Sequence, residues 1–226
     1  MTTLGLMLGS LPLARTQRHL ARLLADVAPA NTRVIELMPH DLPHHAPYAD
    51  VPAPAGALEW RREISSVDGL IVVTPTRDRS IPGSLKSAID WAGDSSGSSA
   101  LTGMPTVIAG VSVGDLPRFA SLQHLRTVLG DKGAVLRSQP ETVLFASNES
   151  FDAEGLPVDQ DLVAEARELI SAAAGVAAHQ RRAQTATTGE VVLPGTDPIA
   201  AVAAAGPAPA SPPTGPLTAP GAPALA

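Results

Sequence analysis

The sequence predicts an α/β domain in which helices cover both faces of a parallel sheet, followed by a tail without regular structure. Two observations carry this prediction. Up to about residue 182, short apolar runs alternate with stretches in which apolar residues recur at helical spacing. The runs are apolar at consecutive positions, which is typical of parallel strands that are buried on both faces.

Each predicted strand is a short apolar run that ends near glycine, proline or a polar residue. The first run ends at Gly9-Ser10, and the third ends at Thr74-Pro75. The last strand is interrupted. The strands are expected at Leu4–Leu8, Arg33–Leu37, Gly69–Val73, Thr106–Val111, and Ala134–Leu136 with Val143–Phe145.

The predicted helices lie between and after these strands, where apolar residues share one helical face. Leu20, Leu23, Leu24 and Val27 show this spacing. The helices are expected at His19–Val27, Leu58–Ser66, Ser84–Ala92, Phe119–Leu129 and Leu162–Ala177. Because crossovers between parallel strands are right-handed, a doubly wound five-stranded parallel sheet of this kind fits the flavodoxin-like order 2-1-3-4-5.

The composition excludes several classes of function. The net charge is −6, so no global basic field would attract nucleic acid. There is no cysteine, which rules out disulfides, thiolate metal sites and a cysteine nucleophile. The apolar start is typical of a buried strand, and no run reaches the roughly 20 apolar residues of a membrane span. We therefore expect a cytoplasmic protein that binds neither nucleic acid nor membranes.

The composition changes near residue 183. Ala, Pro, Thr and Gly dominate residues 183–226, where the charged side chains are Glu190 and Asp197. A segment with so many prolines can neither propagate a helix nor offset its ordering entropy by burying side chains. We expect a folded domain at 1–182 and a disordered tail at 183–226, which is either a tether or docking segment or a dispensable extension.

Ligands of such sheets bind beyond the carboxyl ends of the strands, where the strand order reverses. This edge carries the loops Gly9–Gln17, Pro75–Pro82 and Ser112–Arg118. The first loop leads into a helix, whose N-terminal N–H groups favour an anion. Gly9-Ser10 and Arg15-Thr16 can therefore hold a phosphate group, although Ser and Thr before a helix are also ordinary N-caps.

The same residues carry a resemblance to a known family. Gly9-Ser10-Leu11, followed by Arg18-His19-Leu20-Ala21, is similar to G-S-L-R-x-x-S-x-N-x-x-L-A, the opening of the NADPH-dependent FMN reductases. The most specific match is Asp68–Trp91, which resembles the family pattern D-G-x-I-x-x-T-P-E-Y-N-x-S-I-P-G-x-L-K-N-A-I-D-W. Phe151–Gly155 matches F-D-x-x-G before the last helix. Gln123-His124-Leu125-Arg126 and Gln139-Pro140-Glu141 resemble the fourth helix and the following strand, notably of the chromate and quinone reductase branch. The resemblance covers roughly residues 3–180.

The resemblance implies a homodimer or homotetramer that binds FMN and takes hydride from NADPH or NADH. Electrons would pass to free flavin, a quinone or a similar small-molecule acceptor. The flavin would carry the chemistry, so no catalytic side chain is expected. The cofactor-binding residues that the resemblance suggests are Ser10, Arg15, Thr16, Gln17, Pro75, Thr76, Arg77, Asp78, Ser112 and Gly114.

The loops also depart from the family pattern. Pro12 stands where the family has Arg, Arg15 and Gln17 stand where it has Ser and Asn, and Thr76-Arg77-Asp78 replaces E-Y-N. Arg15 could restore the charge lost at Pro12, and Arg77 could stack on an aromatic ring or pair with Asp78. The charge of Asp78 would disfavour an anionic reduced flavin. The alternative is a flavodoxin-like protein that has lost FMN and acts as a binding or regulatory module.

Two smaller groups have simpler interpretations. His40, His44 and His45 lie in a Pro-rich loop but lack helical spacing and a fourth anchor, so we expect no metal site. Lys86 and Asp90 are four residues apart and could pair on one helix face.

A hydrolase is set aside because the sequence contains no nucleophile elbow or triad.

Overall fold

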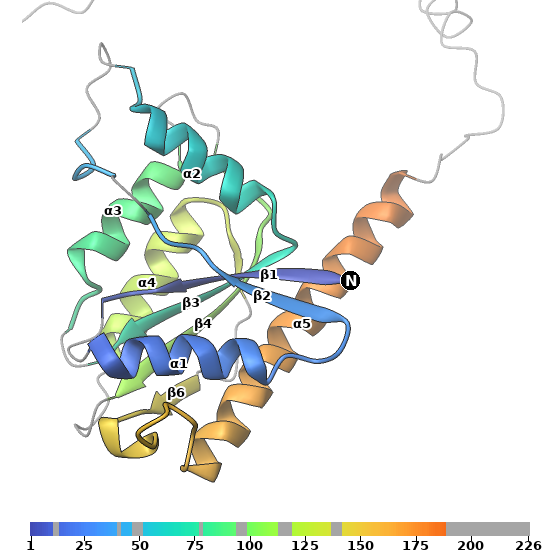
Figure 1. The fold of residues 1–226 in the computed structure, drawn as a ribbon. Coiled ribbons are helices and arrows are strands. Elements are labelled where there is room, and N and C mark those ends of the chain that lie inside the picture. Colours follow the sequence, from blue (N-terminus) through green and yellow to red (C-terminus); the bar gives the residue numbers. More distant parts are fainter. Residues whose placement is uncertain are drawn as a thin grey trace, which may run out of the picture. The chain divides into compact units, whose positions relative to one another are not determined.

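The computed structural model describes residues 1–10, 14–39, 42–46, 52–76, 79–93, 99–112, 119–136 and 142–188, with side chains up to residue 183. Figure 1 shows helices packed around a central sheet. The strands are β1 (Thr2–Leu8), β2 (Thr32–Glu36), β3 (Gly69–Pro75), β4 (Pro105–Ser112), β5 (Val135–Leu136) and β6 (Thr142–Phe145). The helices are α1 (Ala14–Asp26), α2 (Ala55–Ser65), α3 (Gly83–Ala92), α4 (Ala120–Asp131), α5 (Gln160–Thr188) and the 3-10 turn η1 (Asn148–Ser150).

The sheet has the order β2-β1-β3-β4-β5, and its strand pairs are parallel. β5 pairs with the start of β4, at Pro105 and Thr106, whereas β6 pairs with its end, from Ala109 to Ser112. β5 and β6 therefore share one position beside β4, as two pieces of one interrupted strand. The predicted flavodoxin-like order and the interrupted last strand are confirmed.

Both faces of the sheet are buried. In β3, Ile71 and Val73 pack into the cluster formed with α1 and α5, while Leu70 and Val72 pack into the cluster formed with α2, α3 and α4. Figure 1 shows the helices in these two groups. This alternation between two apolar layers explains why the strands are apolar at every position.

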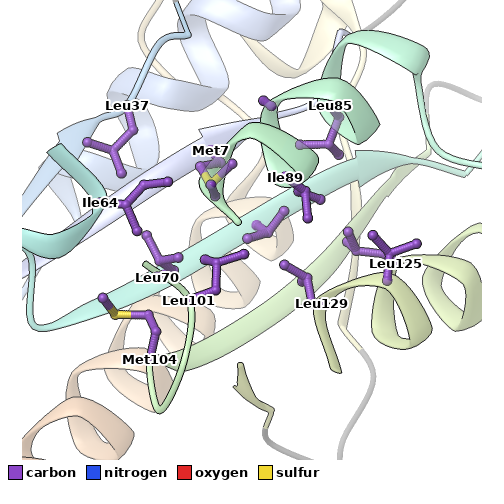
Figure 2. Packing of buried hydrophobic residues seen from close by; sticks show 14 of the residues in the cluster. Met7, Leu37, Ile64, Leu70, Leu85, Ile89, Leu101, Met104, Leu125 and Leu129 are labelled. Carbon is purple, nitrogen blue, oxygen red and sulfur yellow. The ribbon is translucent and has the colours of Figure 1, made fainter. Parts of the chain in front are cut away.

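Side chains from α2, α3 and α4 fill the apolar layer on the second face of the sheet. Figure 2 shows Ile64 of α2, Ile89 of α3 and Leu125 of α4 gathered with Met7 and Leu70 of the sheet. Ile64, Ile89 and Leu125 are fully buried. The layer therefore holds α3 and α4, the helices that follow β3 and β4, against the sheet.

The element boundaries differ from the expected ones mainly at two helices. α1 begins at Ala14 rather than at His19, because its first turn is polar and lies outside the apolar stripe. α5 continues to Thr188, beyond the domain boundary expected at residue 182, because most of the residues between Ala177 and Gly189 are Ala, Arg or Gln, which favour helix. Within the described parts of the chain, we find no helix with the length and apolar character needed to cross a membrane.

Two glycines in the fold should respond to alanine in opposite directions. A Cβ on Gly110 of β4 would overlap the methyl group of Thr76, so Gly110→Ala should lower the free energy of unfolding by about 1–3 kcal/mol. A Cβ on Gly175 of α5 would meet open space, so Gly175→Ala should raise it by about 0.5–1 kcal/mol through helix propensity. Urea unfolding measures both. A change of the same sign in the two variants would contradict this account of the packing.

Candidate functional site

Backbone hydrogen bonds hold the carboxyl ends of the strands in one row. The N–H of Gly9 donates to the carbonyl of Val73 at 2.7 Å, just past the end of β1. The N–H of Thr76 donates to Val111 at 2.9 Å, and the N–H of Ala146 donates to Ser112 at 3.0 Å. Each bond joins the ends of two neighbouring strands. The loops that leave β1, β3, β4 and β6 therefore start from one line along this edge.

The turn that begins α1 offers hydrogen-bond donors at this edge. Ser10 and Arg15 are exposed and Gln17 is half-buried. The first turn of α1 contains no acidic residue of its own, so no carboxylate within the turn opposes its N–H groups and the positive end of the helix dipole. Hydroxyl, guanidinium and amide donors beside a helix N-terminus suit an anion such as a phosphate group.

Three of the expected site residues instead turn their side chains into the protein. Thr16 is fully buried, and its hydroxyl donates to Asn148 Oδ1 at 2.8 Å. The hydroxyl of Thr76 donates to the carbonyl of Val111 at 3.2 Å, and its methyl group lies over Gly110. Ser112 is also buried. These residues shape the edge of the sheet from within.

The other expected residues divide into two groups. Pro75 is half-buried, and its Cδ lies 3.4 Å from the point where a Cβ on Gly9 would stand, so the ends of β1 and β3 approach closely. Arg77, Asp78 and Gly114 lie outside the described residues. Their assignment to the cofactor site remains a prediction.

A further segment at this edge was not expected to belong to the site. It follows β6, and it contacts the start of α1 through Asn148 and through Asp152, whose carbonyl accepts a hydrogen bond from Arg15 Nη2 at 3.0 Å. The signal was available, because the expected last strand ends on the same edge as its neighbours. The match of Phe151–Gly155 to the family pattern also lies in this segment.

A side-chain hydrogen bond joins the segment after β3 to the helix after β4. Ser80 Oγ lies 3.0 Å from His124 Nδ1 on α4. Ser80 is exposed and His124 is half-buried. This bond ties together two of the elements that border the carboxyl edge.

Comparison with known proteins places the chain in a family. The sequence profile of the NADPH-dependent FMN reductases matches residues 1–149. The chain belongs to this family. A 2-hydroxy-1,4-benzoquinone reductase of Burkholderia sp is 34% identical over 158 residues, which cover 70% of this chain and 86% of that relative. A quinone reductase of Pseudomonas putida is 31% identical over 156 residues, with 68% of this chain and 83% of that relative covered.

A solved structure agrees with this family assignment. FerB, described as a flavoenzyme NAD(P)H:(acceptor) oxidoreductase from Paracoccus denitrificans, superposes with a TM-score of 0.70 at 27% sequence identity. The superposition covers 80% of this chain and 99% of FerB. The NADPH-dependent FMN reductase family therefore accounts for both the sequence and the sheet order of the chain.

In this family member, a charged cluster surrounds Asp90 of α3. Lys86 Nζ lies 2.6 Å from Asp90 Oδ2, and Lys132 Nζ lies 3.7 Å from Oδ1. His45 Nδ1 is 3.8 Å from Oδ2, and its ring packs edge-on against Trp91, with 4.7 Å between centroids. The expected pairing of Lys86 with Asp90 is confirmed.

Burial lowers the pKa of His45 from its ordinary value of 6.5. Asp90 opposes this shift, while Lys132, Lys86 and Arg61 reinforce it. Of the other two histidines in this stretch, His44 is exposed and His40 lies outside the described residues. No group of three or more His, Cys, Asp or Glu side chains is placed to hold a metal ion in the parts of the chain that the structure describes.

The edge strand β6 is covered by Glu165 of α5. Burial raises the pKa of Glu165, and the N–H of Phe145, which donates to the carboxylate, opposes this shift. The carboxylates of Asp159, Asp161 and Glu168 add to the upward shift. Glu165 therefore links α5 to β6 near the point where the segment after β6 departs.

The lowered pKa of His45 gives a pH dependence with a definite sign. Between its folded pKa and its ordinary 6.5, the unfolded chain binds more protons than the folded one, so stability falls as the pH falls through this window. His45→Gln removes this loss. Wild type should therefore lose stability relative to His45→Gln as the pH drops below about 6.5, measured by urea unfolding.

His179→Gln serves as the control for the loss of one imidazole, because His179 is exposed on α5. If the free energy of unfolding of wild type instead rises relative to that of His45→Gln as the pH falls, the attraction of Asp90 outweighs burial and the assigned cause is wrong.

Proposed function

We propose that the chain is an FMN-dependent NAD(P)H oxidoreductase that reduces quinones, free flavin or similar two-electron acceptors. The observation that carries the proposal is the acid-free turn of donors at the start of α1, in a chain of the NADPH-dependent FMN reductase family. A cofactor phosphate has the charge that this turn favours.

Different residues at the carboxyl edge of the sheet would bind the phosphate and the ring of FMN. Ser10, Arg15 and Gln17, with the N–H groups of the first turn of α1, would bind the phosphate. The ring would lie along the segments after β3 and β4, where Pro75 is half-buried. FMN supplies the hydride transfer between NAD(P)H and the acceptor, and the chain binds and orients it.

Quinones are the acceptor class that the comparisons favour. The Burkholderia relative is named for the reduction of 2-hydroxy-1,4-benzoquinone, and the Pseudomonas putida relative is named a quinone reductase. No serine triad or metal is needed for such a reaction, because the flavin carries the electrons. A small planar acceptor such as a quinone would reach the flavin at the carboxyl edge of the sheet.

The assembly and location of the enzyme complete the proposal. Homodimers or homotetramers are what the family resemblance implies, with FMN at the subunit edge. We place the enzyme in the cytoplasm, where its electron donors NADPH and NADH are available. Its net charge of −6 supports small-molecule partners over nucleic acid.

The first test is the absorbance spectrum of the purified protein, before and after FMN is added and the excess removed. The proposal predicts a retained, stoichiometric flavin and NAD(P)H oxidation that depends on an added quinone. A preparation that retains no flavin, and oxidises no NAD(P)H with FMN present, would overturn the proposal. It would favour the alternative of a binding or regulatory module without FMN.

A second test concerns the loop in which the family has E-Y-N. Arg77→Tyr with Asp78→Asn restores an aromatic ring and removes a negative charge beside the proposed flavin. FMN should bind about fivefold more tightly, as measured by quenching of its fluorescence. Thr76 is left in place because its hydroxyl and methyl group are buried against Val111 and Gly110. Unchanged affinity would show that these two residues do not face the cofactor.

A further inference from the structure

The first turn of α1 is held by a segment far away in the sequence. Thr16 donates its hydroxyl proton to Asn148 Oδ1 at 2.8 Å, across a separation of 132 residues. Arg15 Nη2 donates to the carbonyl of Asp152 at 3.0 Å, across a separation of 137 residues. Two successive residues of the proposed phosphate-binding turn are thus bonded to the segment after β6. We call residues 147–155 the clasp.

The clasp has an ordered backbone of its own. Ser147 caps the start of η1, and its Oγ accepts a hydrogen bond from the N–H of Glu149 at 3.1 Å. The hydroxyl of Ser150 accepts one from the N–H of Ser147 at 3.2 Å. Asp152 turns its carboxylate back, and its Oδ1 accepts from the N–H of Leu156 at 2.7 Å. The clasp groups that accept hydrogen bonds from Thr16 and Arg15 are therefore an amide oxygen and a backbone carbonyl, and neither is a carboxylate.

The clasp also packs against the second turn of α1. The rings of His19 and Phe151 meet edge to face, with 5.2 Å between centroids. Gly155 has a φ of 83°, and a Cβ at that position would lie 2.6 Å from His19 Nε2. The turn at Gly155 therefore needs a residue without a side chain, because it needs both a positive φ and the space over the imidazole.

The first-turn N–H groups of a helix have no partner inside the helix, and the turn frays unless other groups hold it. A site that orders its donors before the ligand arrives binds more tightly, because less ordering entropy is lost on binding. We propose that the clasp pre-orders the first turn of α1 for the phosphate of FMN. Thr16 and Asn148 are positioning residues that act through Arg15, Gln17 and the backbone of that turn.

This inference rests on the proposed function. It predicts different effects on FMN and riboflavin binding, whereas a general role of the clasp in stability would affect both equally. FMN and riboflavin share the ring and the ribityl chain, but only FMN carries the phosphate. Loss of the clasp bond should weaken FMN binding while leaving riboflavin binding nearly unchanged. The ratio of the two affinities therefore reports on the phosphate turn alone.

The experiment measures the affinity of the apoprotein for FMN and for riboflavin by fluorescence quenching. Thr16→Val removes the hydroxyl at nearly constant shape and should weaken FMN binding about 5- to 30-fold. Riboflavin affinity should change by less than about twofold. Thr16→Ser keeps the hydroxyl and should retain the wild-type affinity ratio.

Asn148→Ala tests the other side of the same bond at an exposed position, where folding is less at risk. It should lower the FMN to riboflavin affinity ratio as Thr16→Val does. Asn31→Ala is the matched control, because Asn31 is exposed at the opposite edge of the sheet, before β2. The melting temperature of each apoprotein is recorded alongside the affinities.

The affinity ratios of the variants decide whether the clasp positions the first turn of α1. A lower affinity ratio in Thr16→Val and Asn148→Ala, with Thr16→Ser and Asn31→Ala at the wild-type ratio, supports the positioning role. Equal losses for FMN and riboflavin, or an unchanged FMN affinity, overturn it. If Thr16→Val does not fold, Asn148→Ala decides by itself. If the wild-type protein binds riboflavin as tightly as FMN, the positioning role of the clasp is overturned and the proposed function stands. If it binds neither flavin, the proposed function is overturned as well.

Discussion

The structure depends on the parallel pairing of β1, β3 and β4, three strands that are buried on both faces. Helices keep water from both sides of these strands, so their backbone groups must find partners within the sheet. The pairing continues past the strands at Gly9, Thr76 and Ala146. The carboxyl edge therefore takes its geometry from the sheet, and the loops that bind a ligand need only extend from positions that are already set.

The sequence predicted the fold well because burial on two faces leaves a clear pattern. Runs such as Gly69–Val73 are apolar at every position, and only a few connections between such strands are compatible with right-handed crossovers. The ends of the helices were harder. The first turn of α1 contains no apolar stripe, and the mixture of Ala, Arg, Gln and Thr after Ala177 suits a helix as well as the start of a tail. Local composition cannot decide between those states.

The position of the candidate site was predictable, but the direction of its side chains was not. Topology places the ligand edge without reference to any single residue. Whether Thr16 faces the ligand or the protein depends on Asn148, which lies 132 residues away. Thr76 likewise turns inward because Gly110 on β4 leaves room for its methyl group. Contacts between residues so distant leave no periodic pattern in a single sequence, and this is why the clasp was missed.

The substitutions in the first loop give the clasp a physical reason to matter in this chain. Pro12 stands where the family has Arg, so the loop lacks one guanidinium, and a proline also has no N–H to donate. In the proposed binding mode, fewer donors in the loop would leave more of the phosphate charge to the first turn of α1 and to Arg15. Those groups bind well only when they are already ordered. A chain that has lost donors from its loop therefore depends more strongly on the contacts that hold that turn. In this structure these contacts are the hydrogen bonds that Thr16 and Arg15 donate to Asn148 and Asp152.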